Sequence, residues 1–279
     1  MIINRVELTG YNYQKVNSDY FFEPGLNMII GDNASGKTTI LNSIISGFSA
    51  ETFQEHWSGY DTQFNLSENY PNQEPITTIE FQYQGATFCL SKKIKKDGIE
   101  CQLYIINEQG TKSFVCEGVE AIERTRQYSN EIIYLAGEEI DSMRHHLGIL
   151  NHDGQSLSEY QSLLNELLKK YGSGYWSDKM ATVVDGQIVV VTLHKLSPEI
   201  LAQGAISFLV LMSVVASVKM NKSSPILIID DFWRSMDYSS IDRVRQCLSE
   251  VLDSQVIVTS HSMHLSDFEV ESNMIQLNR

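Results

Sequence analysis

The eight residues Gly31–Thr38, with the sequence GDNASGKT, match the phosphate-binding pattern G-x-x-x-x-G-K-[ST] at every position. The apolar segment 26–30 before them predicts a buried strand, and segment 38–45 after them has the apolar spacing of a helix. A strand, this loop and a helix in series form the context in which the pattern binds a phosphate chain. The sequence therefore predicts an α/β domain that binds a nucleoside triphosphate.

The residues of this loop have distinct expected roles. Gly31 and Gly36 allow tight turns and let backbone N–H groups approach the phosphates closely. We expect Lys37 to reach the β- and γ-phosphates and the Thr38 hydroxyl to ligate Mg²⁺. The nucleotide-binding residues expected in and just after the loop are Asn33, Ala34, Ser35, Gly36, Lys37, Thr38 and Thr39.

The charge balance argues against a surface built mainly to hold nucleic acid. The chain of 279 residues has 21 Lys and Arg against 35 Asp and Glu, a formal net charge of −14. Its one dense basic run, KKIKK at 92–96, falls at the expected end of an antiparallel strand. A solvated turn is favoured there over contact with a polyanion. We expect DNA binding by this chain alone to be weak.

Cysteine use and hydropathy favour a cytoplasmic protein without a membrane segment. The four cysteines form no C-x-x-C pair and suit no zinc spacing, which indicates buried thiols in a reducing compartment. The first residues lack the basic segment and apolar core of a secretion signal. The longest apolar stretch, 205–218, is too short to cross a bilayer and favours a buried helix.

Apolar periodicity predicts one α/β domain over residues 1–279, with a helical lobe inserted at 139–180. Strands are expected at 2–8, 20–22, 26–30, 76–83, 87–94, 100–107, 131–135, 180–184, 187–193, 225–230 and 256–260. Helices are expected from the loop to about Gly47, and at 118–128, 205–220 and 240–252. Residues 50–75 are polar and are expected to form an irregular surface excursion.

Two later strands end in residues that suit phosphate chemistry. Asp230 and Asp231 follow an apolar strand, whose carboxyl end would lie beside the loop in a parallel sheet. We expect Asp230 to hold Mg²⁺ and Asp231 to orient or deprotonate an attacking water. The next strand ends in His261, which would contact the γ-phosphate or that water. A histidine satisfied locally at a strand end is the alternative.

Together these motifs resemble the ATP-binding heads of the SMC/RecF/OLD branch of ABC ATPases, over essentially the whole chain. The matching segments are 25–27, 31–38, the acid pair 230–231, Asp237 in a D-loop and 259–261. The resemblance implies an α/β P-loop NTPase fold of the ABC head type, a mixed sheet with an antiparallel β subdomain and a helical lobe. It also implies ATP and Mg²⁺ as cofactors, ATP hydrolysis, and a homodimer or heteromeric assembly that forms on ATP.

The resemblance places a signature segment at 201–204, where Gly204 would contact ATP bound to the partner protomer. A helix start presents free N–H groups to an anion, and a glycine allows close approach. Three features depart from the family: Ala202 replaces the usual serine, no Q-loop glutamine is evident near Glu138, and the lobe is too short for coiled-coil arms.

The departures leave more than one function open. The favoured hypothesis is an ATPase that signals to DNA or to a separate effector protein, in genome maintenance or phage defence. An effector domain fused after His261 is not expected, because only 18 residues follow it. The alternatives are a nucleotide-gated scaffold with little hydrolysis and, less favoured, the nucleotide-binding subunit of a membrane transporter.

Overall fold

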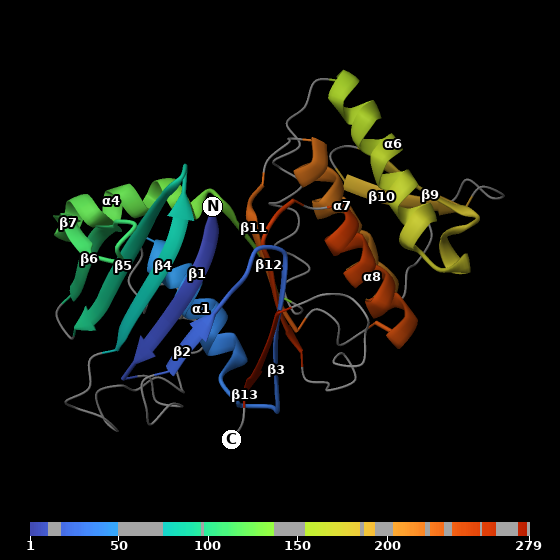
Figure 1. Cartoon of the computed structure of the whole chain (residues 1–279). Helices are drawn as coiled ribbons and strands as arrows, with labels where there is room; N and C mark the ends of the chain where they lie inside the picture. The colour runs from blue at the N-terminus through green and yellow to red at the C-terminus, as the bar shows by residue number, and fades with distance from the viewer. Residues whose placement is uncertain are drawn as a thin grey trace.

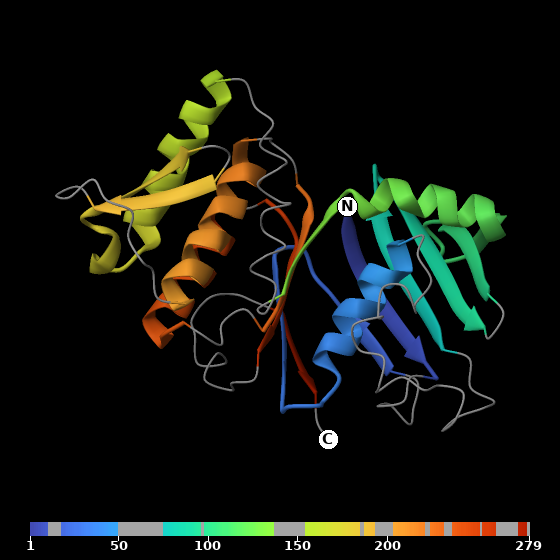
Figure 2. The ribbon, with the colours of Figure 1, turned by 180° about the vertical axis from the view of Figure 1, so that it is seen from behind.

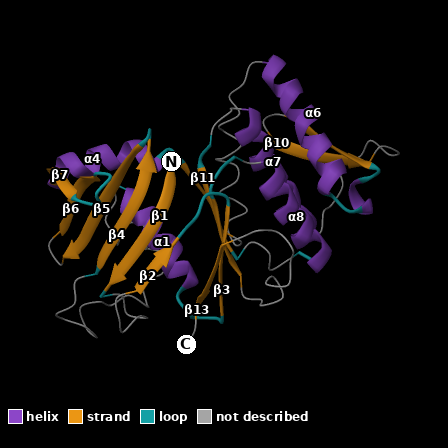
Figure 3. Cartoon of the chain, viewed as in Figure 1, coloured by secondary structure: helices purple, strands orange, loops and turns teal. Residues whose placement is uncertain are grey.

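Two β-sheets lie on either side of helix α1 (Lys37–Phe48) in the computed structural model (Figure 1; Figure 3). The structure describes residues 1–10, 18–49, 75–95, 98–136, 154–184, 187–192, 203–220, 224–231, 236–251, 253–260 and 273–277. Part of the expected lobe, 139–153, and the expected excursion at 50–74 lie outside these residues.

The first sheet is antiparallel, with the strand order β2-β1-β4-β5-β6-β7. Buried and exposed side chains alternate along its strands, so one face packs against α1 and the other is solvated. The strands are β1 (Ile2–Thr9), β2 (Ser18–Phe21), β4 (Ile76–Tyr83), β5 (Ala86–Lys95), β6 (Gly98–Ile106) and β7 (Lys112–Glu117). Helix α4 (Gly118–Ser129) follows and packs against β6 and β7. The sequence did not predict β7.

The second sheet is parallel, with the strand order β13-β3-β12-β11-β8. Its central strands β3, β11 and β12 are buried at almost every residue, as expected for strands covered on both faces. The strands are β3 (Leu26–Gly31), β8 (Ile132–Ala136), β11 (Ile226–Asp230), β12 (Val256–Ser260) and β13 (Asn273–Leu277). The edge strand β13 was also missed in the sequence. Because all pairs are parallel, the carboxyl ends of these strands meet at one edge.

Helices cover the parallel sheet on the face away from α1 (Figure 2). Alternate strand residues divide between the two sides: Ile228 packs toward α1, whereas Leu227 and Ile229 pack toward the helices. This layer contains α6 (Gly154–Tyr171), α7 (Gln203–Met220) and α8 (Tyr238–Val251), with the hairpin β9 (Lys179–Val184) and β10 (Gln187–Thr192). The two sheets and this layer match the predicted fold class. No helix within the described ranges is long and apolar enough to cross a membrane.

Lys92 corrects the expectation of a solvated basic turn. Its side chain is buried, and Nζ donates hydrogen bonds to the carbonyl oxygens of Ser46 and Ser49 at 2.5 and 2.8 Å. These carbonyls belong to the last turn of α1 and to its C-cap residue, where backbone acceptors are left free and a cation is attracted. Farther along β5, Lys95 forms an ion pair with Glu100. At these two positions the basic run is therefore committed to contacts within the fold.

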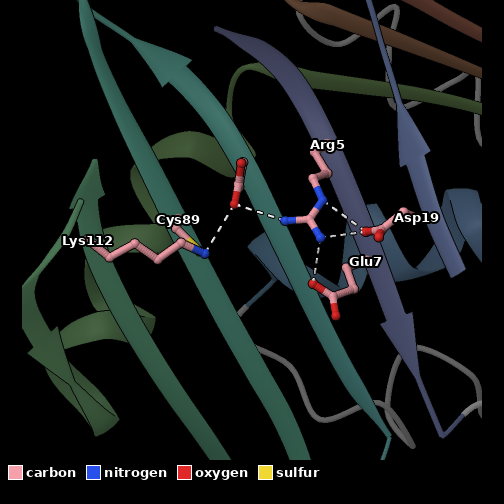
Figure 4. Close-up of polar contacts among 6 residues, drawn as sticks. Arg5, Glu7, Asp19, Cys89 and Lys112 are labelled. Atoms are coloured by element: carbon pink, nitrogen blue, oxygen red, sulfur yellow. Dashed lines mark hydrogen bonds and ion pairs between the residues drawn. The ribbon is translucent and has the colours of Figure 1, made fainter. Parts of the chain in front are cut away.

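A charged cluster lies on the outer, solvated face of the antiparallel sheet (Figure 4). The Arg5 guanidinium forms ion pairs with Glu7, Asp19 and Glu80, at nitrogen–oxygen distances of 2.7 to 3.2 Å. Lys112 joins the cluster through Glu80 at 3.1 Å. These two cations and three carboxylates pair with one another across neighbouring strands, which suits a structural role on the sheet surface.

Candidate nucleotide-binding site

The parallel register gathers the predicted site residues at one edge of the second sheet. Strand β12 lies between β3 and β11, with Ser260 opposite Ile30 and Val258 opposite Ile229. The loop that leaves β3 and the acids that end β11 therefore lie on either side of the end of β12. Ligands of α/β sheets bind outside the carboxyl ends of the strands, and the predicted residues meet there.

The loop between β3 and α1 has the curvature that a bound phosphate chain requires. Gly36 and Ala34 have φ angles of 97° and 60°, in the left-handed region, and turn the backbone around the loop. At Gly31 a Cβ atom would lie 2.5 Å from the Ser35 Oγ atom and 3.1 Å from the Leu277 backbone oxygen, so a larger residue would require the Ser35 side chain and strand β13 to shift. Residues 32–34 at the crest are exposed. The loop thus leads from a buried strand to the N-terminus of α1 with its crest in solvent.

Lys37 occupies the inside of this loop. It is 5% exposed, and Nζ donates to the carbonyl oxygens of Gly31 and Asp32, both at 2.7 Å. Burial lowers the pKa of Lys37, and the carboxylates of Asp231, Asp230 and Asp32 oppose this shift in that order. The ammonium group therefore lies within electrostatic reach of both acids that the sequence assigned to the site.

The two acids are joined by a threonine from the neighbouring strand. The buried Thr259 hydroxyl donates to Asp230 Oδ1 at 2.5 Å and accepts from the Asp231 backbone N–H at 2.9 Å. Asp231 has a φ of 46°, which is uncommon for a residue with a Cβ atom. From the sequence, Thr259 was expected only as part of the segment 259–261. The two hydroxyl residues that end the otherwise apolar strand β12, Thr259 and Ser260, were the signal that could have indicated it.

The donor set fits Mg²⁺ bound together with phosphates. Asp230 offers one carboxylate that is 9% exposed, and Thr38 offers an exposed hydroxyl in the first turn of α1. Mg²⁺ usually takes one or two carboxylates and completes its shell with phosphate and water. In the described part of the chain, no group of three or more His, Cys, Asp or Glu could hold a metal alone.

The Ser35 hydroxyl is also consistent with an anionic ligand in the loop. Among the described residues the buried Ser35 Oγ atom has no hydrogen-bond partner. A buried hydroxyl without a partner is costly, and a phosphate oxygen in the loop would be a suitable acceptor.

The remaining predicted residues occupy other parts of the molecule. Gly204 is the second residue of α7, and α7 and α1 lie on opposite faces of the parallel sheet (Figure 2). Asp237 caps α8: its Oδ1 atom accepts from the Ser240 N–H at 2.9 Å and from the Ser239 hydroxyl at 2.7 Å. The Ser239 hydrogen bond is the main cause of the lowered pKa of Asp237. His261, Ala202 and Glu138 lie outside the described residues.

Comparison with known proteins identifies one matching family and one matching fold. The family model described as the RecF/RecN/SMC N terminal domain matches residues 2–277. No curated protein sequence matches the chain.

Solved SMC heads match 94% of this chain. A structure of the SmcHead bound to the C-winged helix domain of ScpA is 14% identical, with a TM-score of 0.69 over 91% of its length. The SMC head domain from Thermotoga maritima is 19% identical, with a TM-score of 0.56 over 90% of its length. A head with an extended coiled coil, bound to the C-terminal domain of ScpA derived from Pyrococcus furiosus, is 13% identical, with a TM-score of 0.57 over 90% of its length. Likeness at such identities shows the fold.

Proposed function

We propose that this chain, which belongs to the family of RecF/RecN/SMC N-terminal domains, binds Mg²⁺-ATP at Gly31–Thr38 and hydrolyses it. One observation carries the proposal most directly. The Lys37 ammonium lies inside a curved loop at the strand ends, within electrostatic reach of Asp230 and Asp231. A cation, an anion-binding loop and two acids at one sheet edge are the parts that phosphoryl transfer requires.

The chain's own residues have separate tasks in this reaction. Lys37 gives up its bonds to the two loop carbonyls and pairs with the β- and γ-phosphates, while the loop N–H groups hold the phosphate chain. Thr38 and Asp230 hold Mg²⁺. When bound, the metal neutralises charge that develops on the phosphate oxygens. Asp231 orients the attacking water and accepts its proton. His261, next along the chain from β12, contacts the γ-phosphate or this water.

The proposal extends to an assembly of two heads. Gly204 and the N-terminus of α7 complete the ATP site of a second copy or of a related head, so association depends on ATP. The output passes to a separate effector protein or to DNA, in genome maintenance or phage defence in the cytoplasm. Two matching SMC heads were solved with ScpA, which supports a protein partner. The net charge of −14 and the internal contacts of Lys92 and Lys95 favour a protein over DNA as the direct partner.

The Asp231→Asn and Asp230→Asn variants test this function as a matched pair. Asp231→Asn should keep ATP bound but slow hydrolysis at least about tenfold, because it removes a base and no metal ligand. Asp230→Asn should instead weaken Mg²⁺-ATP binding. Single-turnover assays and equilibrium binding measure both effects. Wild-type hydrolysis rates in both variants would contradict the assignment, and tight ATP binding without turnover in the wild type would identify a nucleotide-gated scaffold.

The same Asp231→Asn background tests the assembly. With ATP it should form a dimer by light scattering, and adding Gly204→Asp should abolish that dimer. Two unit charges about 4 Å apart repel by about 4 kcal/mol at an effective dielectric of about 20. ATP affinity of the monomer should stay unchanged, because the loop lies in the other half of the site. A dimer that survives Gly204→Asp would show that the signature segment lies elsewhere.

A further inference from the structure

We propose that Thr259 is a positioning residue that sets the Mg²⁺ requirement of nucleotide binding. It does so by orienting the Asp230 carboxylate and by fixing the backbone that carries Asp231. This inference rests on the proposed function of the site. No separate task for Thr259 was expected from the sequence, and the hydrogen bonds of its hydroxyl indicate one.

The Thr259 hydroxyl holds one oxygen of the expected metal ligand. Thr259 is fully buried on β12, and Asp230 ends the neighbouring strand β11. A hydroxyl has a single proton, and here it is donated to Asp230 Oδ1 at 2.5 Å. A short hydrogen bond to a carboxylate restricts rotation of the group and leaves Oδ2 directed elsewhere. Groups that orient a metal ligand in this way influence metal affinity without touching the metal.

The same hydroxyl also holds the backbone of the second acid. Its oxygen accepts from the Asp231 N–H at 2.9 Å, just where the chain enters the left-handed region at φ 46°. That backbone conformation is unfavourable for a residue with a Cβ atom, and the hydrogen bond stabilises it. The direction of the Asp231 side chain therefore depends on an atom of the neighbouring strand. One hydroxyl sets both acid positions.

A positioning role and a merely structural role predict different results. Thr259→Val keeps the β-branched shape in a buried strand, but it leaves Asp230 Oδ1 and the Asp231 N–H without this partner. If the hydroxyl only stabilised the fold, the variant would melt at a lower temperature and bind Mg²⁺-nucleotide as before. If it positions Asp230, the Mg²⁺ concentration needed for nucleotide binding should rise by about tenfold or more.

The experiment titrates Mg²⁺ into the full-length protein with a fluorescent ATP analogue and repeats the binding measurement in EDTA. Wild type, Thr259→Val and Thr259→Ser are compared, with the melting temperature of each. We expect Thr259→Val to raise the half-maximal Mg²⁺ concentration about tenfold and to leave affinity in EDTA within about twofold. Thr259→Ser retains the hydroxyl and should stay within about threefold of wild type in both measurements.

Several results would overturn the inference. An unchanged Mg²⁺ requirement in folded Thr259→Val would do so, and so would equal defects in the Val and Ser variants. If Thr259→Val fails to fold, Thr259→Ala replaces it in the comparison. A Thr259→Ala variant with the same Mg²⁺ dependence as Thr259→Ser would also overturn the inference. Absence of nucleotide binding by the wild-type protein would overturn the proposed function and this inference together. Wild-type binding with a metal-insensitive Thr259→Val variant would overturn this inference alone.

Discussion

The two ends of helix α1 each hold a buried lysine with the same pattern of contacts. At the start of the helix, Lys37 donates to two carbonyl oxygens of the loop, both at 2.7 Å. At its end, Lys92 reaches across from β5 and donates to the carbonyl oxygens of Ser46 and Ser49, at 2.5 and 2.8 Å. The two lysines are almost equally buried. Neither residue type nor burial therefore explains why only one of them would bind a nucleotide.

The two lysines differ in their position relative to the dipole of helix α1. A helix C-terminus attracts a cation, and this attraction offsets part of the cost of burying the Lys92 charge. A helix N-terminus disfavours a cation. The carboxylates of Asp231, Asp230 and Asp32 offset this unfavourable interaction for the Lys37 ammonium. The carbonyl partners of Lys37 belong to a loop with an exposed crest, whereas Lys92 is enclosed between helix and sheet. The lysine at the unfavourable end is therefore the one suited to bind an anion.

The largest effect is expected from Lys37→Met. It removes the ammonium that pairs with the terminal phosphates, and each charge-assisted hydrogen bond contributes about 1.5–3 kcal/mol. We expect ATP affinity to fall about 100-fold or more, as measured by isothermal titration calorimetry. Lys92→Met is the matched control, with the same substitution at the other end of the helix, and should change ATP affinity less than about threefold. Equal losses in the two variants would show that the helix, and not the Lys37 charge, governs binding.

A smaller effect is expected on the pH dependence of stability at Lys92. Burial lowers the pKa of Lys92 from 10.5 to about 8, against a weaker opposing effect of Cys101. Below pH 8 both the folded and the unfolded lysine are charged, and the folded protein carries the full cost of burying that charge. Between pH 8 and 10.5 the unfolded state binds more protons, so raising the pH relieves this cost.

Over that window the unfolding free energy of the wild type should rise by up to about 3 kcal/mol relative to Lys92→Met. Urea denaturation of both proteins at several pH values measures the difference. Groups that do not interact with Lys92 cancel in the comparison, and Cys101, whose pKa Lys92 lowers, is replaced by alanine in both proteins. A constant difference from pH 7 to 10.5 would show that Lys92 keeps its ordinary pKa in the fold.

Local patterns predicted the parts of the site that are continuous in sequence. Strand β3, the loop and helix α1 follow one another from Leu26 to Phe48, and the acids directly end the apolar strand β11. Each of these segments has its own periodicity or motif, so one sequence sufficed to place them. The register of the parallel sheet then confirmed that the loop and the acids share one edge.

Features that depend on distant contacts were missed or misjudged. The role of Thr259 depends on hydrogen bonds to residues 28 and 29 positions away, and the burial of Lys92 depends on where a helix 43 positions earlier ends. Strand β13 is half exposed at a sheet edge and is defined by its pairing with β3. Strand β7 is largely exposed and lacks a clear alternation of apolar residues. In each case the structure depends on a residue or strand that is distant in the sequence.

A crystal structure of the Asp231→Asn protein with Mg²⁺ and ATP would test the contrast between the two lysines most directly. We predict that Lys37 Nζ leaves at least one of its two loop carbonyls and lies within hydrogen-bonding distance of the β- and γ-phosphates. Lys92 should keep its contacts with the carbonyl oxygens of Ser46 and Ser49. A nucleotide bound away from the loop, or a Lys37 side chain that retains both carbonyls beside bound ATP, would contradict the account.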